Sequence, residues 1–281
     1  MIESLHDSLT LLNGMKIPSI GFGTWQTPDG DIAVNAVKYA LEVGYRHIDT
    51  AAAYGNEESV NKAIRESDIP REELFITTKL WNSDRGYAKT LNAFEDSMKK
   101  LGVDYLDLYL IHWPSNKKDG DKVNADTWKA FEKLYRDGQI KAIGVSNFLV
   151  HHLESLMESA EIEPMINQIE FHPGQMQSEV LEFCRKHAIL IEGWSPLGTG
   201  RMLENPQLKE IAGNYRKSVA QLCIRWALQH EVLPLPKSVT PSRIAENMQV
   251  FDFEISESDM KTIDDMPYFG GSGLDPDKVK F

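Results

Sequence analysis

Short apolar runs recur along the chain, and polar turn residues separate them. The runs are rich in hydrophobic and β-branched residues, which is typical of buried strands. Between the runs, apolar residues repeat with the period of a helix. Residues 32–44 form one such stripe and end in Gly44, and residues 218–230 begin with the helix-capping residue Ser218. The eight strand-like runs begin at Ile20, Tyr45, Phe75, Asp107, Lys141, Ile166, Ile189 and Val232.

This alternation predicts an α/β protein. Strands that alternate with helices pair in parallel, and eight such units in about 250 residues fit a closed (β/α)8 TIM barrel. We therefore expect residues 1–281 to form a single domain of this type. An open doubly wound sheet is the alternative, but its GxGxxG motif is incomplete, because Gln26 stands where the third glycine belongs.

Two further segments carry local signals. Residues 8–20 contain two short alternating runs joined at Asn13-Gly14, which predicts a β-hairpin ahead of the barrel. Residues 115–126 are polar and rich in lysine, and we expect an exposed loop there rather than a domain boundary.

Composition and charge exclude several classes of protein. A hydrophobic content of 42% can fill a large core, and a net charge of −12 argues against nucleic-acid binding through a basic face. No run approaches the ~20 apolar residues that cross a membrane. The first twelve residues carry acids where a secretory peptide has basic residues, so a cytoplasmic protein is expected. Cys184 and Cys223 lack disulfide or metal-ligand spacing, and we expect both to be reduced and buried.

Four chemically active side chains stand at or just after predicted strand ends, where TIM barrels carry their active sites. They are Asp49, Tyr54, Lys79 and His112. Taken singly, each has a structural explanation, such as a turn cap, a surface aromatic, an ion pair or a core histidine. Their joint placement on adjacent strands instead favours a proton-transfer set that lacks a metal-ligand cluster.

The chemistry of this set follows from charge. A phenol with a pKa of ~10 can protonate a carbonyl oxygen, but it needs help to form a phenolate near pH 7. Lys79 can provide that help, since opposite charges ~4 Å apart interact by ~4 kcal/mol at an effective dielectric constant of about 20, before desolvation is subtracted. Asp49 would hold the ammonium group, and His112 would orient the substrate oxygen.

Seven ordered motifs resemble the aldo-keto reductase family, especially its bacterial branch similar to 2,5-diketogluconate reductases. They are GFGTW, HIDTAAAYGNE, ITTKLW, YLDLYLIHWP, IGVSNF, NQIEFHP and PKSVTPSRIAEN, and the resemblance runs from about Leu11 to Met266. It implies a TIM barrel that uses NADPH to reduce aldehydes and ketones, with keto-sugars and small dicarbonyls among the candidate substrates. It also implies that the four strand-end residues match the catalytic tetrad, with Tyr54 as the general acid.

A hydride donor is required because no side chain supplies hydride. The segment after the eighth run brings cations and hydroxyls together, which suits a phosphate group. The family resemblance assigns this segment to the adenosine 2′-phosphate of NADPH, and it assigns other positions to the nicotinamide half, with Trp194 stacking on the ring. The implied cofactor contacts are Gly23, Thr24, Trp25, Ser146, Asn147, Gln168, Trp194, Ser195, Pro196, Leu197, Lys237, Ser238, Val239, Thr240, Arg243 and Asn247.

Tryptophans that follow strand ends predict an aromatic substrate pocket. The expected pocket residues are Trp25, Trp81, His112, Trp113 and Phe148. Because residues 114–128 and the tail after Met266 are short compared with those of long-looped family members, we expect an open pocket. His151 and His152 lack partners at ligand spacing in the sequence and are interpreted as structural, so no metal site is expected.

Two other functions remain open at this level. A Schiff-base lyase could use Lys79 to form an imine with a carbonyl substrate. A barrel that binds a nicotinamide cofactor without catalysis could serve as a regulatory subunit, because a fold does not fix a function. The expected partner is a small carbonyl substrate, with no nucleic acid and no membrane, and a monomer is expected from the family.

Overall fold

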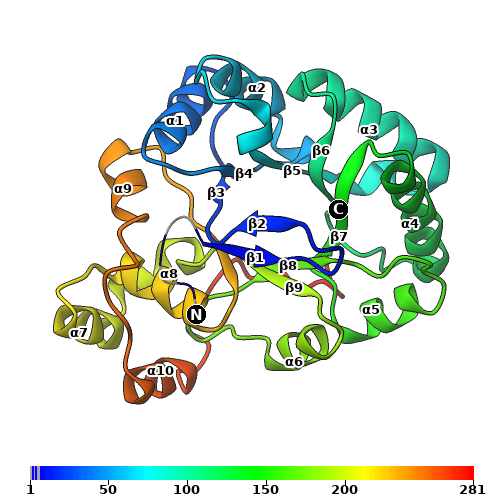
Figure 1. Ribbon diagram of the computed structural model, residues 1–281. Coiled ribbons are helices and arrows are strands. Elements are labelled where there is room, and N and C mark those ends of the chain that lie inside the picture. The colour runs from blue at the N-terminus through cyan, green and yellow to red at the C-terminus, as the bar shows by residue number, and fades with distance from the viewer. Residues whose placement is uncertain (1, 3, 5–6) are drawn as a thin grey trace.

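The computed structural model describes residues 2, 4 and 7–281, and a barrel of parallel strands forms its centre (Figure 1). Residues 1, 3, 5 and 6 belong to the segment from which the lack of a secretory signal was predicted, and they lie outside the described part. Each of the eight strand-like runs of the sequence forms one strand. The strands are β3 (Phe22–Gly23), β4 (His47–Asp49), β5 (Phe75–Leu80), β6 (Leu106–Ile111), β7 (Ile140–Ser146), β8 (Ile166–Glu170), β9 (Leu190–Trp194) and β10 (Leu233–Leu235).

The sheet closes on itself. Its strands follow the order β3 to β10, and every neighbouring pair is parallel. The backbone N–H of Gly21 donates to Pro234 O at 3.1 Å, and that of Gly23 donates to Pro236 O at 3.0 Å, which joins the two edges. The strands meet tightly there, since a Cβ atom on Gly23 would lie 3.2 Å from Leu235 O. The predicted (β/α)8 barrel is therefore confirmed.

Helices surround the barrel (Figure 1). Helix α8 begins after Ser218, whose side chain caps it together with Gln221, as the sequence predicts. The expectation of a loop at 115–126 is wrong in its second half, because α4 begins at Gly120 with a polar first turn. The helices are α1 (Asp31–Glu42), α2 (Glu57–Arg65), α3 (Tyr87–Leu101), α4 (Gly120–Arg136), α5 (Val150–Met157), α6 (Ser178–Lys186), α7 (Pro206–Asn214), α8 (Val219–Gln229), α9 (Pro241–Glu246) and α10 (Glu257–Asp264).

The predicted hairpin is present and crosses one end of the barrel (Figure 1). Strands β1 (Ser8–Thr10) and β2 (Lys16–Pro18) pair antiparallel, and Gly14 adopts a positive φ of 83° in the turn. The Asn13 side chain donates to the backbone oxygen of Lys141, near the start of β7. The hairpin therefore covers the amino ends of the strands and leaves the carboxyl ends for the site.

Burial and hydropathy agree with two further expectations. Both cysteines are free and buried, and burial raises the pKa of the Cys184 thiol to about 12. Within the described part of the chain, no helix combines the length and the apolar character that a membrane span requires.

Candidate active site

Three strands and one short turn bring the predicted tetrad together at the carboxyl end of the barrel. Lys79 on β5 is fully buried, and its Nζ donates to Asp49 Oδ1 on β4 at 2.6 Å. Tyr54 ends the 3-10 turn η1 (Ala52–Tyr54), which places its hydroxyl 3.4 Å from the same Nζ. The ring of His112, just after β6, lies 5.5 Å from the Tyr54 ring, centroid to centroid. The four side chains therefore form one contiguous group.

Burial and the nearest opposite charge shift the pKa values of Lys79 and Tyr54 in opposite directions. Burial is the largest influence on Lys79 and would lower its pKa, but the neighbouring acidic groups, with Asp49 first among them, together outweigh burial and raise the pKa above the usual value. For Tyr54, burial raises the pKa more than the Lys79 cation lowers it. Tyr54 is therefore a protonated phenol at neutral pH, beside a cation that can stabilise its phenolate. A protonated Lys79 is a poor nucleophile, which disfavours the Schiff-base alternative.

His112 is held in its neutral form. Burial, with the Lys79 cation as a second cause, lowers the pKa of His112 well below its ordinary value. Its Nδ1 atom is buried and has no hydrogen-bond partner among the described residues. The ring lies edge-on between Tyr54 and Trp81, with its centroid 5.3 Å from that of Trp81. A neutral imidazole in this place can share a hydrogen bond with a substrate oxygen.

A polar chain crosses the barrel beneath these residues. Gln168 on β8 donates from Nε2 to Asp49 Oδ2 at 2.9 Å, although β4 and β8 lie four strands apart in the barrel. The same nitrogen donates to Glu192 Oε2 on β9 at 2.8 Å. Burial raises the pKa of Glu192 to about 8, and the Asp49 charge adds to this. Asp49 thus connects Lys79 on one side to Gln168 on the other.

A cavity of about 500 Å³ opens above the tetrad. Tyr54 and His112 reach it from below, and three of the predicted pocket tryptophans form walls. Phe148 does not line it, because its side chain is 0% exposed and packs in the core against His152. The lining residues are Trp25, Ala53, Tyr54, Trp81, His112, Trp113, Ser146, Asn147, Gln168, Trp194, Leu274 and Phe281.

A second cavity, of about 400 Å³, shares Trp25 with the first. It runs over the ends of β9 and β10 to α9, where Lys237 and Arg243 supply positive charge. The Lys237 ammonium donates to Gln26 O at 3.1 Å, and partial burial lowers its pKa. Among the predicted cofactor contacts, those that line this second cavity are Trp25, Ser195, Pro196, Leu197, Lys237, Ser238, Arg243 and Asn247.

Four predicted contacts lie outside both cavities. Gly23 and Thr24 are buried, and the Thr24 hydroxyl donates to Asp49 O at 2.9 Å. Val239 and Thr240 are exposed residues just before α9. The first pair can support β4, which carries Asp49, while the second pair lies beside Ser238 at the surface.

The predicted nicotinamide contacts form a hydrogen-bonded network. Asn147 donates from Nδ2 to His112 O at 2.9 Å and to Ser146 Oγ at 3.0 Å, and its Oδ1 accepts from Trp194 Nε1 at 2.9 Å. Trp194 lies edge-on to Trp25, with centroids 5.6 Å apart. These bonds hold the Trp194 ring in place in the wall of the first cavity, beside Trp25, which lines both cavities.

The chain after α10 folds back over the first cavity. The Phe281 ring stacks on Trp81 at 5.5 Å and lies edge-on to Trp113 at 5.4 Å. Ser272 donates to Glu170 through its backbone N–H and its hydroxyl, at 2.7 and 2.6 Å. The pocket is therefore partly covered, whereas the shortness of this tail in the sequence had suggested an open one.

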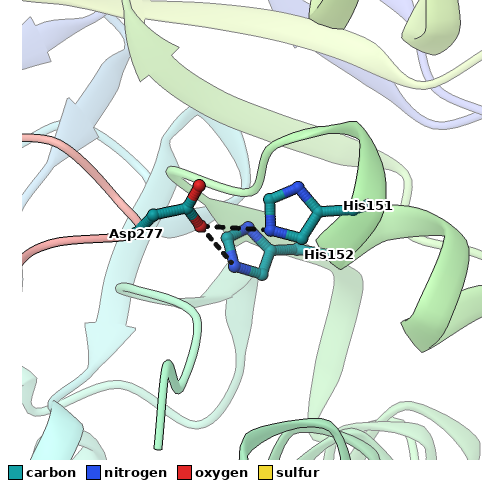
Figure 2. Close-up of side chains that lie close together, drawn as sticks. All are labelled: His151, His152 and Asp277. Atoms are coloured by element: carbon teal, nitrogen blue, oxygen red, sulfur yellow. Dashed lines mark hydrogen bonds and ion pairs between the residues drawn. The ribbon is translucent and has the colours of Figure 1, made fainter.

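The tail is also held by the histidine pair on α5. Figure 2 shows His151 and His152 converging on Asp277, whose Oδ1 lies 3.1 Å and 3.3 Å from their Nε2 atoms. The two histidines thus have a partner that sequence spacing did not indicate. The three ligand atoms lie within 4.8 Å of one another, a spacing that a metal ion could use.

The hydrogen bonding of His152 disfavours a metal there. Its Nδ1 accepts from the backbone N–H of Leu149 at 3.2 Å, so the neutral ring carries its proton on Nε2, facing Asp277. Ligating histidines normally donate through the nitrogen that does not bind the metal. Burial lowers the pKa of His152 to about 4, with the neighbouring His151 as a second cause, which keeps this ring neutral. The cluster therefore serves to anchor the tail.

Several site residues were missed in the sequence. Glu192 carries a signal, since it is a carboxylate inside the apolar run ILIEGW. Leu274 and Phe281 carry none, because their place over the cavity depends on long-range contacts of the tail. The lining residues absent from the predicted set are Gln26, Ala53, Thr199, Gly200, Leu203, Ser218, Ala220, Leu235, Pro236, Glu246, Leu274 and Phe281.

Comparison with known proteins agrees with this geometry. Residues 19–267 match the model of the aldo/keto reductase family. The chain is 51% identical to the glyoxal reductase of Bacillus subtilis (strain 168), over 100% of both chains. It is 43% identical to the methylglyoxal reductase DkgA of Escherichia coli (strain K12), over 96% of this chain and 97% of that one. A crystal structure of a Gox0644 mutant in complex with NADPH superposes with a TM-score of 0.91, at 42% identity, over 98% of this chain and 99% of that chain.

Proposed function

The chain belongs to the aldo/keto reductase family, and on that premise we propose that it uses NADPH to reduce small dicarbonyl compounds to hydroxycarbonyl products. The observation that carries the proposal is the contact of the Tyr54 hydroxyl with the buried Lys79–Asp49 pair, on the floor of an aromatic cavity. Relatives named for glyoxal and methylglyoxal reduction support this substrate class.

The tetrad accounts for the proton transfer in this reaction. Tyr54 is protonated before the reaction and can donate its proton to the carbonyl oxygen of the substrate. As the phenolate forms, the Lys79 cation 3.4 Å away stabilises it. Neutral His112 orients the same carbonyl oxygen, and Asp49 keeps Lys79 charged and in place. NADPH, when bound, supplies the hydride to the carbonyl carbon.

The two neighbouring cavities, which share Trp25, suit a long dinucleotide. We assign the positively charged end, with Lys237 and Arg243, to the adenosine 2′-phosphate. The other end, beside Trp194, is assigned to the nicotinamide ring. Gln168 supports this assignment, because it lines the first cavity and no described residue donates a hydrogen bond to its Oε1.

The first cavity favours small substrates. Its volume of about 500 Å³ is walled by Trp25, Trp81 and Trp113, and the tail covers part of its mouth. A dicarbonyl of two to four carbons can place one carbonyl at Tyr54 and His112 while its remainder contacts the aromatic wall. Keto-sugars are longer and more polar than these dicarbonyls and would meet the aromatic wall and Phe281 with their hydroxyl groups, so we propose that they react more slowly.

The test is an assay of NADPH absorbance with a panel of aldehydes, ketones, dicarbonyls and keto-sugars, run in parallel with NADH. We expect oxidation of NADPH, fastest with methylglyoxal or glyoxal, and weaker use of NADH. Oxidation of neither cofactor, although NADPH binds, would support a regulatory barrel instead. Faster reaction with keto-sugars than with small dicarbonyls would contradict the proposed substrate class.

A further inference from the structure

A second buried carboxyl group lies in the barrel, apart from Asp49. Glu192 on β9 is 0% exposed, and its Oε2 accepts from Gln168 Nε2 at 2.8 Å. Its other oxygen has no hydrogen-bond partner among the described residues and lies 3.8 Å from His47 Nε2. Burying a carboxyl group costs free energy unless it is compensated, so its presence at this place calls for a reason.

Glu192 contacts Gln168, and both side-chain N–H groups of Gln168 are already engaged in hydrogen bonds. Gln168 has two amide hydrogens, and both are used, one by Asp49 Oδ2 across the barrel and one by Glu192 Oε2 on the adjacent strand. The reverse orientation of the amide would place its oxygen against the Asp49 carboxylate, which has no hydrogen to donate, and it would remove the N–H donor that Glu192 Oε2 now accepts from. The Gln168 carbonyl Oε1 must therefore point away from both and toward the cavity that this residue lines.

We propose that Glu192 is a positioning residue for the cofactor, which acts together with Asp49 to fix the amide of Gln168 with its oxygen toward the nicotinamide end of the site. This inference rests on the proposed function. A fixed acceptor favours a carboxamide N–H of the bound cofactor, and a rotating amide would present its own N–H groups there instead. Asp49 supplies one anchor while it also binds Lys79, and Glu192 supplies the second anchor from the adjacent strand.

Charge in the barrel is consistent with this role. Glu192 faces Asp49, Lys79 and His47, and its raised pKa of about 8 keeps the carboxyl group neutral near pH 7. Burial lowers the pKa of His47 to about 3, with the Lys79 cation as a second cause, so that ring is neutral as well. A neutral Glu192 can still accept from Gln168, and it leaves the Asp49 charge for Lys79.

The test compares two substitutions by titration of NADPH binding. Glu192→Met keeps the volume and removes the acceptor, and we expect it to raise the Kd of NADPH about five- to tenfold, the loss typical of one hydrogen bond. Glu192→Gln keeps an acceptor and should stay within about twofold of the wild type. Asp107→Asn, which alters a buried carboxylate at the opposite end of strand β6, is the matched control and should not change the Kd.

A double-substitution cycle separates positioning from general damage. In a Gln168→Ala background, Glu192→Met should change the Kd by less than about twofold, because the side chain through which it acts is gone. An equal loss of affinity in both backgrounds would overturn the inference. Unchanged NADPH affinity in Glu192→Met would overturn it as well.

Nuclear magnetic resonance covers the case in which Glu192→Met does not fold. The side-chain amide signals of Gln168, assigned by their loss in Gln168→Ala, should shift in Glu192→Gln and stay in place in Asp107→Asn. Identical Gln168 signals in the wild type and in Glu192→Gln would show that Gln168 does not contact Glu192, which would overturn the inference. This measurement needs no cofactor. A wild-type protein that fails to bind NADPH would therefore contradict the proposed function, but the Gln168 signals would still test the orientation of the Gln168 amide.

Discussion

At the scale of single residues, burial sets the protonation states that the chemistry needs. Tyr54 stays a phenol although a lysine stands beside it, because burial raises its pKa more than the cation lowers it. Lys79 stays an ammonium although it is buried, because Asp49 lies 2.6 Å away. His112 stays neutral for both reasons, burial and the same cation. Burial thus fixes the states of Tyr54 and His112, while the buried ion pair keeps Lys79 charged.

The state of His112 predicts the pH dependence of catalysis. Because its pKa lies well below the usual 6.5, its neutral form persists as the pH falls through the ordinary range of histidine titration. We expect kcat/KM to show no acid limb with a midpoint near 6.5 when it is measured from about pH 5.5 to 7.5. An acid limb at that midpoint in the wild type that disappears in His112→Gln would contradict a neutral His112.

The tetrad positions were predictable because each lies at or next to a strand end that the apolar runs delimit. Glu192 was not assigned a role, since a carboxylate within a strand gives no sign of which side chain it meets across the barrel. Phe148 was assigned to the pocket wrongly, because a position after a strand end does not tell whether the side chain turns into the cavity or into the core.

At the scale of elements, strands and tail differ in how far local sequence determines them. All eight strands were predicted, because each is an apolar run bounded by turn residues. The start of α4 was missed because its first turn is polar and reads as a loop. The path of the tail over the cavity depends on Glu170 and on the His151–His152 pair, which no local pattern connects to it.

The contact of Asp277 with His151 and His152 predicts an effect on substrate binding that is separate from catalysis and from stability. Asp277→Ala removes the shared partner of His151 and His152, so Phe281 should spend less time over the cavity (Figure 2). We expect the KM for a small dicarbonyl to rise about three- to tenfold, with kcat and the melting temperature nearly unchanged.

The control for this change is Lys278→Ala, in the same segment, whose ammonium contacts Asp275 and no cavity residue. It should leave the KM unchanged. Equal KM values for the wild type and Asp277→Ala would show that the anchor does not control access to the cavity.

At the scale of the whole molecule, the closed barrel separates two ends with different tasks. The hairpin covers the amino ends of the strands, and the site occupies the carboxyl ends (Figure 1). The net charge of −12 is spread over a chain whose second cavity still carries the positive charges of Lys237 and Arg243. A single domain over residues 1–281, a cytoplasmic location and a monomeric state stay predictions.

Buried histidines predict how stability depends on pH. His47, His112 and His152 have lowered pKa values in the folded protein, about 3 for His47 and about 4 for His152. The unfolded chain takes up protons at these positions below about pH 6.5, whereas the folded chain does not, so the free energy of unfolding should fall as the pH drops. The slope is about 1.4 kcal/mol per pH unit for each histidine.

Glu192 changes the pH dependence of stability in the opposite direction. Its folded pKa of about 8 lies above the ordinary value of 4.5, so its contribution to stability is fully present below pH 4.5 and is lost progressively as the pH rises from there to about 8. Urea unfolding of the wild type and Glu192→Gln measures both effects. A wild-type stability that does not fall between pH 6.5 and 4.5 would contradict the neutral histidines, and an equal loss of stability between pH 6.5 and 8 in both proteins would contradict the Glu192 assignment.

The central claim is that Tyr54 donates the proton in an NADPH-dependent carbonyl reduction. It is tested most directly by stopped-flow measurement of NADPH oxidation in the wild type and Tyr54→Phe, with methylglyoxal as substrate and NADPH binding titrated separately. We predict oxidation by the wild type, and in Tyr54→Phe an unchanged NADPH Kd with a rate at least about a hundredfold lower. A Tyr54→Phe protein that oxidises NADPH at nearly the wild-type rate would contradict the account.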